Sequence, residues 1–132
     1  MTTAVGLRLG DDQAWVELAP DPDGPEQWRV TADWVGAFTA DFETDLEPEE
    51  AAAFADALLA GVDGGGPFRL EVTEGRNNPL LLQSVPADDG LVFLVRLTPN
   101  GHDTGTHLDV ELDPVDRAEL RARIEDFRRS LV

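Results

Sequence analysis

The residues best suited to hold a metal or to move a proton gather in one segment of the chain. His102, Asp103 and His107 lie close together in a stretch rich in glycine and threonine. Two imidazoles and a carboxylate form a ligand set that zinc or iron accepts in proteins. However, Gly101 and Gly105 predict a loop without the helix or strand that would fix a ligand pair in advance. We expect a solvated loop without a cofactor, and keep a metal or ligand site, with enzymatic activity, as the alternative hypothesis.

Paired carboxylates are the second candidate for chemistry, because 27 of the 132 residues are Asp or Glu. Glycosidase-type catalysis needs two carboxyl groups that face each other across a cleft, one of them with a raised pKa. Asp41, Glu43 and Asp45 instead share the outward side of one predicted strand, where solvent keeps carboxylates ionised. The chain has no Cys, and neither of its serines, Ser84 and Ser130, lies in a Gly-x-Ser-x-Gly motif. We therefore expect a protein that is not an enzyme.

The charge of the chain constrains its partners more than any motif constrains its chemistry. The formal net charge is −17, and all ten basic residues are arginines. Residues 1–68 carry 15 acids and two arginines, whereas residues 69–132 carry 12 acids and eight arginines. A field of this sign repels nucleic acid and anionic membranes and speeds the encounter with basic proteins. We expect a basic protein partner, no nucleic acid and no membrane.

Two further patterns bear on location and on phosphate binding. The first ten residues lack a basic region followed by an apolar stretch, which predicts no signal peptide and a cytoplasmic protein.

The glycine run at 64–66 is not a phosphate-binding loop, because it follows a predicted helix and lacks the Lys-Ser/Thr pair. It is expected to end that helix.

An acidic tract without any base provides the first candidate for a binding surface. Nine acids and no arginine lie between Arg29 and Arg69. The fold is expected to bring the outward side of one strand next to the start of a helix, and so to form one negative patch. The predicted partner-binding residues of this patch are Asp41, Glu43, Asp45, Glu47, Glu49 and Glu50. The alternative interpretation is that these charges serve solubility alone.

Trp15 is the second candidate for partner binding. It lies on the opposite side of its predicted strand from Ala14 and Val16, and shares that side with Glu17. An outward tryptophan beside acids suits an anchor for a basic, partly apolar partner. If helices cover both faces of the sheet, Trp15 is instead a core residue. The sequence leaves both interpretations open.

The hydrophobic pattern predicts the elements that position these residues. Alternation of apolar and polar residues predicts eight strands in two sets of four. This pattern is typical of antiparallel sheets with one side on the core and one side facing solvent. Apolar residues at helical spacing predict one helix over about residues 48–62, opening at Pro48, and another over about residues 114–131, opening at Pro114. The sequence therefore predicts one α+β domain, residues 1–132, built from two β-β-β-β-α units.

The two predicted helix starts resemble each other. The segment 46–54 reads Leu-Glu-Pro-x-Glu-x-Ala-x-Phe, and the segment 112–120 reads Leu-Asp-Pro-x-Asp-x-Ala-x-Leu, at an offset of 66 residues. One interpretation is an old duplication. The other is that any junction from strand to helix favours an acid, a proline and an i, i+4 apolar pair.

The order of elements also carries a family resemblance. It rests on the acid-rich helix at 46–59, the strand at 68–72, the hairpin at 89–93 and the closing helix at 112–127. In these features the chain resembles the WapI-type immunity proteins and their uncharacterised actinobacterial relatives. The resemblance implies a small cytoplasmic protein that neutralises the nuclease tail of a contact-dependent toxin. It implies no individual contact residues, because no motif fixes them.

Taken together, these patterns favour a non-enzymatic acidic protein that masks a basic partner surface, as an immunity protein does against a nuclease-type toxin. A nuclease must attract phosphate, so its cleft is positive, and carboxylates can occupy the phosphate positions. The alternatives are a small metal- or ligand-binding domain that uses the segment from His102 to His107, and an accessory domain without a separable activity.

Overall fold

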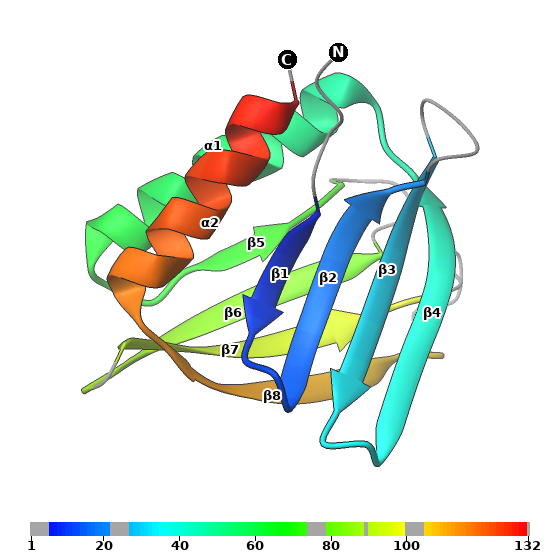
Figure 1. The fold of residues 1–132 in the computed structure, drawn as a ribbon, viewed down its shortest axis with the longest axis horizontal. Coiled ribbons are helices and arrows are strands. Elements are labelled where there is room, and N and C mark those ends of the chain that lie inside the picture. The colour runs from blue at the N-terminus through cyan, green and yellow to red at the C-terminus, as the bar shows by residue number, and fades with distance from the viewer. Residues whose placement is uncertain (1–5, 22–26, 74–78, 89, 100–104, 132) are drawn as a thin grey trace.

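The chain folds into two four-stranded antiparallel sheets, each followed by a helix, as the sequence predicts (Figure 1). The computed structural model describes residues 6–21, 27–73, 79–88, 90–99 and 105–131. Sheet A and its helix comprise β1 (Leu7–Gly10), β2 (Ala14–Pro20), β3 (Gln27–Trp34), β4 (Phe38–Asp45) and α1 (Pro48–Gly64). Sheet B and its helix comprise β5 (Arg69–Glu71), β6 (Leu80–Ala87), β7 (Gly90–Leu97), β8 (Leu108–Val115) and α2 (Arg117–Ser130).

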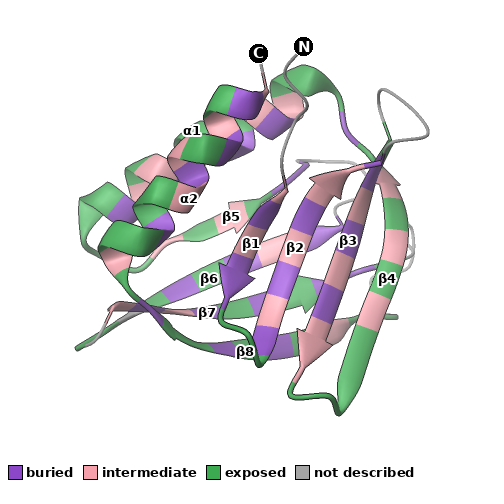
Figure 2. Cartoon of the chain, viewed as in Figure 1, coloured by how far each residue is buried: buried purple, intermediate pink, exposed green. Residues whose placement is uncertain are grey.

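Each sheet is a meander in which neighbouring strands in the sequence pair with each other. Alternation of apolar and polar residues gives each strand one buried side, visible as alternating bands on β2 and β3 in Figure 2. Leu9, Val16 and Val30 are at most 2% exposed on the inner side of sheet A. Phe93 and Leu112 are fully buried on the inner side of sheet B. The two inner sides therefore contribute to the same core.

The sheets meet along one side of the molecule, and the helices lie together on the other. Strand β8 contacts β1 and β2, whereas α2 contacts β1 and α1 contacts β5. Figure 1 shows α1 and α2 side by side, away from the outer side of sheet A. Within the described residues, neither helix has the length and apolar composition that crossing a bilayer demands.

The first helix begins and ends as its sequence indicates. Pro48 occupies the first helical turn, and the backbone N–H of Glu47 donates to the Glu50 carboxylate at 3.0 Å. The helix ends at Gly64 and is capped by Gly65, whose φ of 79° is the left-handed conformation that glycine adopts without strain. Its predicted apolar stripe is confirmed, since Phe54 and Leu58 are at most 3% exposed.

The second helix begins later than predicted. Pro114 lies in β8, not in α2, and the next residue, Val115, is 5% exposed and paired with Leu91. Asp116 then caps the helix, because its carboxylate accepts the N–H of Glu119 at 3.0 Å. The proline was mistaken for a helix opening because strand pairing holds the chain extended for one further residue.

Among the contacts that join sheet A to the other half of the chain are an aromatic pair and two hydrogen bonds. Trp28 packs edge-on against Phe127 of α2, with ring centroids 6.0 Å apart. The indole N–H of Trp34 donates to the Glu111 carbonyl of β8 at 3.1 Å. The guanidinium of Arg123 donates to the Gly10 carbonyl at 3.0 Å, at the end of β1. Aromatic packing and hydrogen bonds to backbone carbonyls therefore fix how the halves meet.

The turn between β3 and β4 holds a strained residue. Val35 has a φ of 46° and Gly36 a φ of 76°, and the N–H of Ala37 donates to the Trp34 carbonyl at 2.8 Å. Two consecutive residues with positive φ mark a type I′ turn, which favours Asn-Gly at these positions. A β-branched residue is unfavourable in this conformation, at a cost of about 1–3 kcal/mol.

Replacing Val35 by Asn is therefore expected to raise the free energy of unfolding by about 1 kcal/mol. Little packing is lost, because Val35 is 53% exposed. Urea denaturation monitored by tryptophan fluorescence measures the change. Val85→Asn is the matched control, since Val85 is 48% exposed in the extended strand β6 and should show no gain. Equal effects of the two substitutions would show that the turn stores no strain.

Candidate functional site

The outer side of sheet A gathers negative charge from three strands. The register places Glu17 opposite Thr31 and Thr31 opposite Asp41, so that the outward residues form rows across the sheet. We call the outward acids of these strands, together with the two exposed acids that follow them, the acidic face. Its members are Glu17, Asp33, Asp41, Glu43, Asp45, Glu47 and Glu49. The outward basic residues of sheet A are Arg8, on β1, and Arg29, on β3.

Arg29 brings one basic side chain from β3 beside the acids of β4. Its guanidinium, on the neighbouring strand, donates to Asp41 and to Glu43 at 3.3 Å, and lies 3.7 Å from the Asp21 carboxylate. The hydrogen bond to Asp41 is the largest cause that raises the pKa of Arg29 above its ordinary value. The sequence offers a signal for this contact, because a hairpin that pairs Trp34 with Phe38 also pairs Arg29 with Glu43.

The predicted contact residues have different surroundings. Asp41 and Glu43 have side chains about 58% and 60% exposed although both pair with Arg29. Asp45 and Glu49 are exposed, and neither makes an ion pair within the described residues. Glu50 is only half-exposed and accepts the N–H of Glu47, so its carboxylate serves the start of α1. The first four therefore present their charge to solvent, whereas Glu50 chiefly caps the helix.

Trp15 lies on the same outer side, and the interpretation that it is a core residue is wrong. It is half-buried, whereas its neighbours Ala14 and Val16 are 2% and 1% exposed on the inner side. The guanidinium of Arg8 lies 4.0 Å from the centroid of its ring. This contact is a cation–π interaction that covers part of the indole. Trp15 is thus an aromatic side chain at the margin of the acidic face.

The outer side of sheet B differs from that of sheet A in its shape and in its charge. A shallow hollow of about 390 Å³ lies there, lined by Arg69, Leu81, Leu94 and the ion pair of Arg96 with Asp109. The Arg96 hydrogen bond holds the pKa of Asp109 below its usual value. Its strands carry two arginines against four acids, Glu71, Asp109, Glu111 and Asp113, whereas the strands of sheet A carry five outward acids against two arginines. The negative excess is therefore greater on sheet A.

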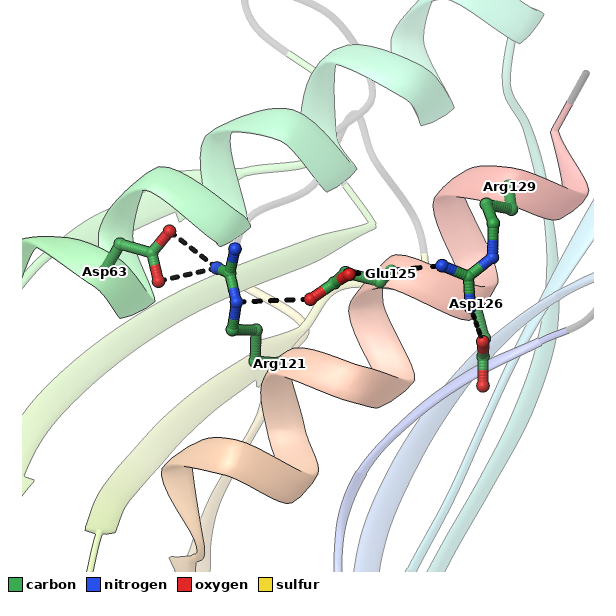
Figure 3. A network of polar contacts seen from close by, with 5 residues as sticks. All are labelled: Asp63, Arg121, Glu125, Asp126 and Arg129. Carbon is green, nitrogen blue, oxygen red and sulfur yellow. Dashed lines mark hydrogen bonds and ion pairs between the residues drawn. The ribbon is translucent and has the colours of Figure 1, made fainter.

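The arginines of α2 neutralise acids that the sequence places in the acidic tract. Arg121 donates to the Asp63 carboxylate of α1 at 2.6 Å, and Arg128 donates to Asp56 at 2.9 Å (Figure 3 shows Asp63 and Arg121). Figure 3 also shows Arg121 and Arg129 on either side of Glu125. Asp56 and Asp63 of the tract are therefore paired with α2, whereas its acids on β4 and at the start of α1 face away from these arginines.

The candidate metal ligands fall largely outside the described residues. His102 and Asp103 lie in the undescribed segment 100–104, so the metal hypothesis stays a prediction. His107 directly precedes β8, and its Nε2 lies 3.8 Å from Asp109 Oδ2. Within the described part of the chain, no group of three or more His, Cys, Asp or Glu side chains could hold a metal ion.

Comparison with known proteins adds no identity to this arrangement. No protein-family model matches the chain, and no curated protein is similar to it.

Proposed function

We propose that this protein is a non-enzymatic cytoplasmic binding protein that masks a basic surface of a partner, as an immunity protein does for a nuclease-type toxin. The observation that carries the proposal is the row of exposed carboxylates on β4, Asp41, Glu43 and Asp45. Arg29 is their one basic neighbour on β3, so the row keeps a negative excess. The proposed resemblance to WapI-type immunity proteins points to the same function.

The physical basis is the match between spaced carboxylates and a surface built for phosphate. Outward residues on one strand recur about every 6.5–7 Å, which is close to the spacing of phosphates along a nucleic-acid strand. A nuclease cleft lined by Arg and Lys would accept such a row in place of its substrate. Charge of this kind acts mainly on the rate of association, which falls as salt screens the field.

The test is capture of partners from a lysate of the source organism, followed by kinetics with the captured protein. The charge-neutralised variant carries Asp41→Asn, Glu43→Gln, Asp45→Asn and Glu49→Gln. Glu47 and Glu50 stay unchanged, since their contact supports the start of α1. The matched control removes four acids elsewhere through Glu71→Gln, Asp88→Asn, Glu111→Gln and Asp113→Asn, so the two variants have equal net charge.

A basic protein should bind the wild type and the control variant, and its association rate with the neutralised variant should be at least about tenfold lower. For the wild type, the rate should fall by a similar factor between about 50 mM and 500 mM salt. Inhibition of nuclease activity in the captured protein distinguishes a toxin from a DNA-binding protein that the acidic face engages as a DNA mimic. Association that is insensitive to salt and to all four substitutions would refute the proposal.

A further inference from the structure

Strand β4 is an edge strand that the fold leaves open. Sheet A has the order β1-β2-β3-β4, and β3 is the one element that packs extensively against β4 in the described part of the chain. The other edges are covered or short. Strands β1 and β8 contact each other, and β5 has three residues and contacts α1. An open edge presents unpaired N–H and C=O groups that can pair with another strand.

At this edge, the apolar inner side of sheet A extends beyond the elements that bury it. Phe38 and Phe42 face the same side as the core residues of β3, because they pair with Trp34 and Val30. Val30 is fully buried, yet Phe42 is only partly buried and Phe38 is 54% exposed. Val35, at the tip of the hairpin, is 53% exposed beside them. A strip of apolar side chains thus lies on the inner side of β4, and the row of carboxylates lies on its outer side.

We infer that an extended segment of the basic partner adds to sheet A along β4 as a fifth strand. Side chains on a strand alternate between two faces, so the segment should alternate apolar residues with Arg or Lys. Its apolar residues would cover Phe38 and Phe42, while its basic residues would lie beside Asp41 and Glu43 as cross-strand pairs. This inference rests on the proposed function, since it assumes that the partner is basic.

Charge excludes a second copy of this chain as the occupant. Antiparallel pairing of two β4 strands about a two-fold axis places the same faces side by side, so carboxylates would meet carboxylates. Each chain carries a net charge of −17, which adds repulsion at longer range. The same carboxylates favour a segment with Arg or Lys at alternate positions. The chemistry of the edge therefore selects a basic strand.

The test uses the full chain, labelled with ¹⁵N, and a peptide of about nine residues that alternates Val with Arg and Lys. A scrambled peptide of the same composition and a Val–Glu alternating peptide are the controls. Addition of the alternating basic peptide should slow hydrogen exchange at amides of β4 (Phe38–Asp45) and leave the amides of β2 unchanged. The scrambled peptide should bind at least about tenfold more weakly, and the acidic peptide should not bind.

Two variants separate strand addition from attraction by charge. Phe38→Ala keeps every carboxylate and should weaken peptide binding about tenfold, with only a small change in melting temperature. The charge-neutralised variant should weaken binding at low salt and lose most of the salt dependence. Binding that needs the carboxylates but ignores Phe38, without slower exchange on β4, would overturn strand addition and leave the proposed function standing.

Three other outcomes also decide whether a partner strand adds to β4. No exchange effect on β4 at about 1 mM peptide, while a basic protein is still captured through the acidic face, would overturn the inference alone. Slow exchange on β4 in a dimer of the free chain, detected by sedimentation, would show that the edge belongs to a second copy. Failure of both the peptide and the capture experiment would remove the inference together with the proposed function.

Discussion

Replacing Phe127 by alanine is expected to lower the free energy of unfolding by about 3–5 kcal/mol. The side chain is fully buried, and its ring meets the edge of Trp28 on sheet A at a centroid distance of 6.0 Å. The substitution removes apolar burial and leaves a cavity where α2, the last helix, docks on the first sheet. Because domains of this kind have a total stability of about 5–15 kcal/mol, much of it would be lost.

Urea denaturation followed by tryptophan fluorescence measures this effect, since Trp28 lies at the site. Phe38→Ala is the matched control, because it removes the same atoms from a ring that is 54% exposed. It should lower the free energy of unfolding by about 1 kcal/mol or less, because the main loss is its ring contact with Trp34 at a centroid distance of 5.9 Å. A loss below about 1.5 kcal/mol for Phe127→Ala would mean that the joint between α2 and sheet A can collapse around the cavity.

The second large effect is expected for Gly90→Ala, at about 2–5 kcal/mol of lost stability. Gly90 opens β7, and its φ of 141° belongs to a region that residues with a Cβ rarely adopt. A Cβ there would also overlap the backbone carbonyl oxygen of Val115, at the end of β8. Backbone atoms cannot move aside as a flexible side chain can, so β8 or the β6–β7 hairpin must shift.

Gly64→Ala is the control for this substitution. Gly64 ends α1, and a Cβ at that position meets nothing within 4 Å. Alanine is the better helix former, so stability should stay the same or rise by up to about 1 kcal/mol. Thermal unfolding of both variants by circular dichroism makes the comparison. Equal stability of the two variants would show that β7 and β8 have room to separate at Gly90.

The fold was largely predictable because it depends on local patterns. Each strand of sheet A alternates apolar and polar residues, and the meander pairs each strand with its neighbour in the sequence. Pro48 and the glycines after residue 63 mark the limits of α1 correctly. The predicted start of α2 was wrong because Pro114 satisfies the sequence rules for a helix and for a strand alike. The pairing of Val115 with Leu91 decides in favour of the strand. That pairing joins residues far apart in the sequence.

The negative charge of the candidate site was predictable from the sequence, but its ion pairs and the exposure of its side chains were not. Counting charges indicates an acidic surface, yet Arg29 reaches Asp41 from another strand and Arg121 reaches Asp63 from another helix. Such contacts depend on register and helix packing, which composition does not contain. The exposure of Phe38 was hidden for a related reason. Its alternation with polar neighbours predicts burial, and only the packing shows that the core ends one strand short of it.

The division of the fold into two consecutive meanders also affects the chain while the ribosome is still making it. Sheet A and α1 are complete before any strand of sheet B exists, but Trp28 must wait for Phe127 on α2, which is synthesised after both sheets. During that interval, the inner side of sheet A lacks much of its cover. Residues 1–68 carry 15 acids and two arginines. The charge is therefore concentrated in the part of the nascent chain that spends longest with its apolar side exposed, where mutual repulsion keeps neighbouring nascent chains apart.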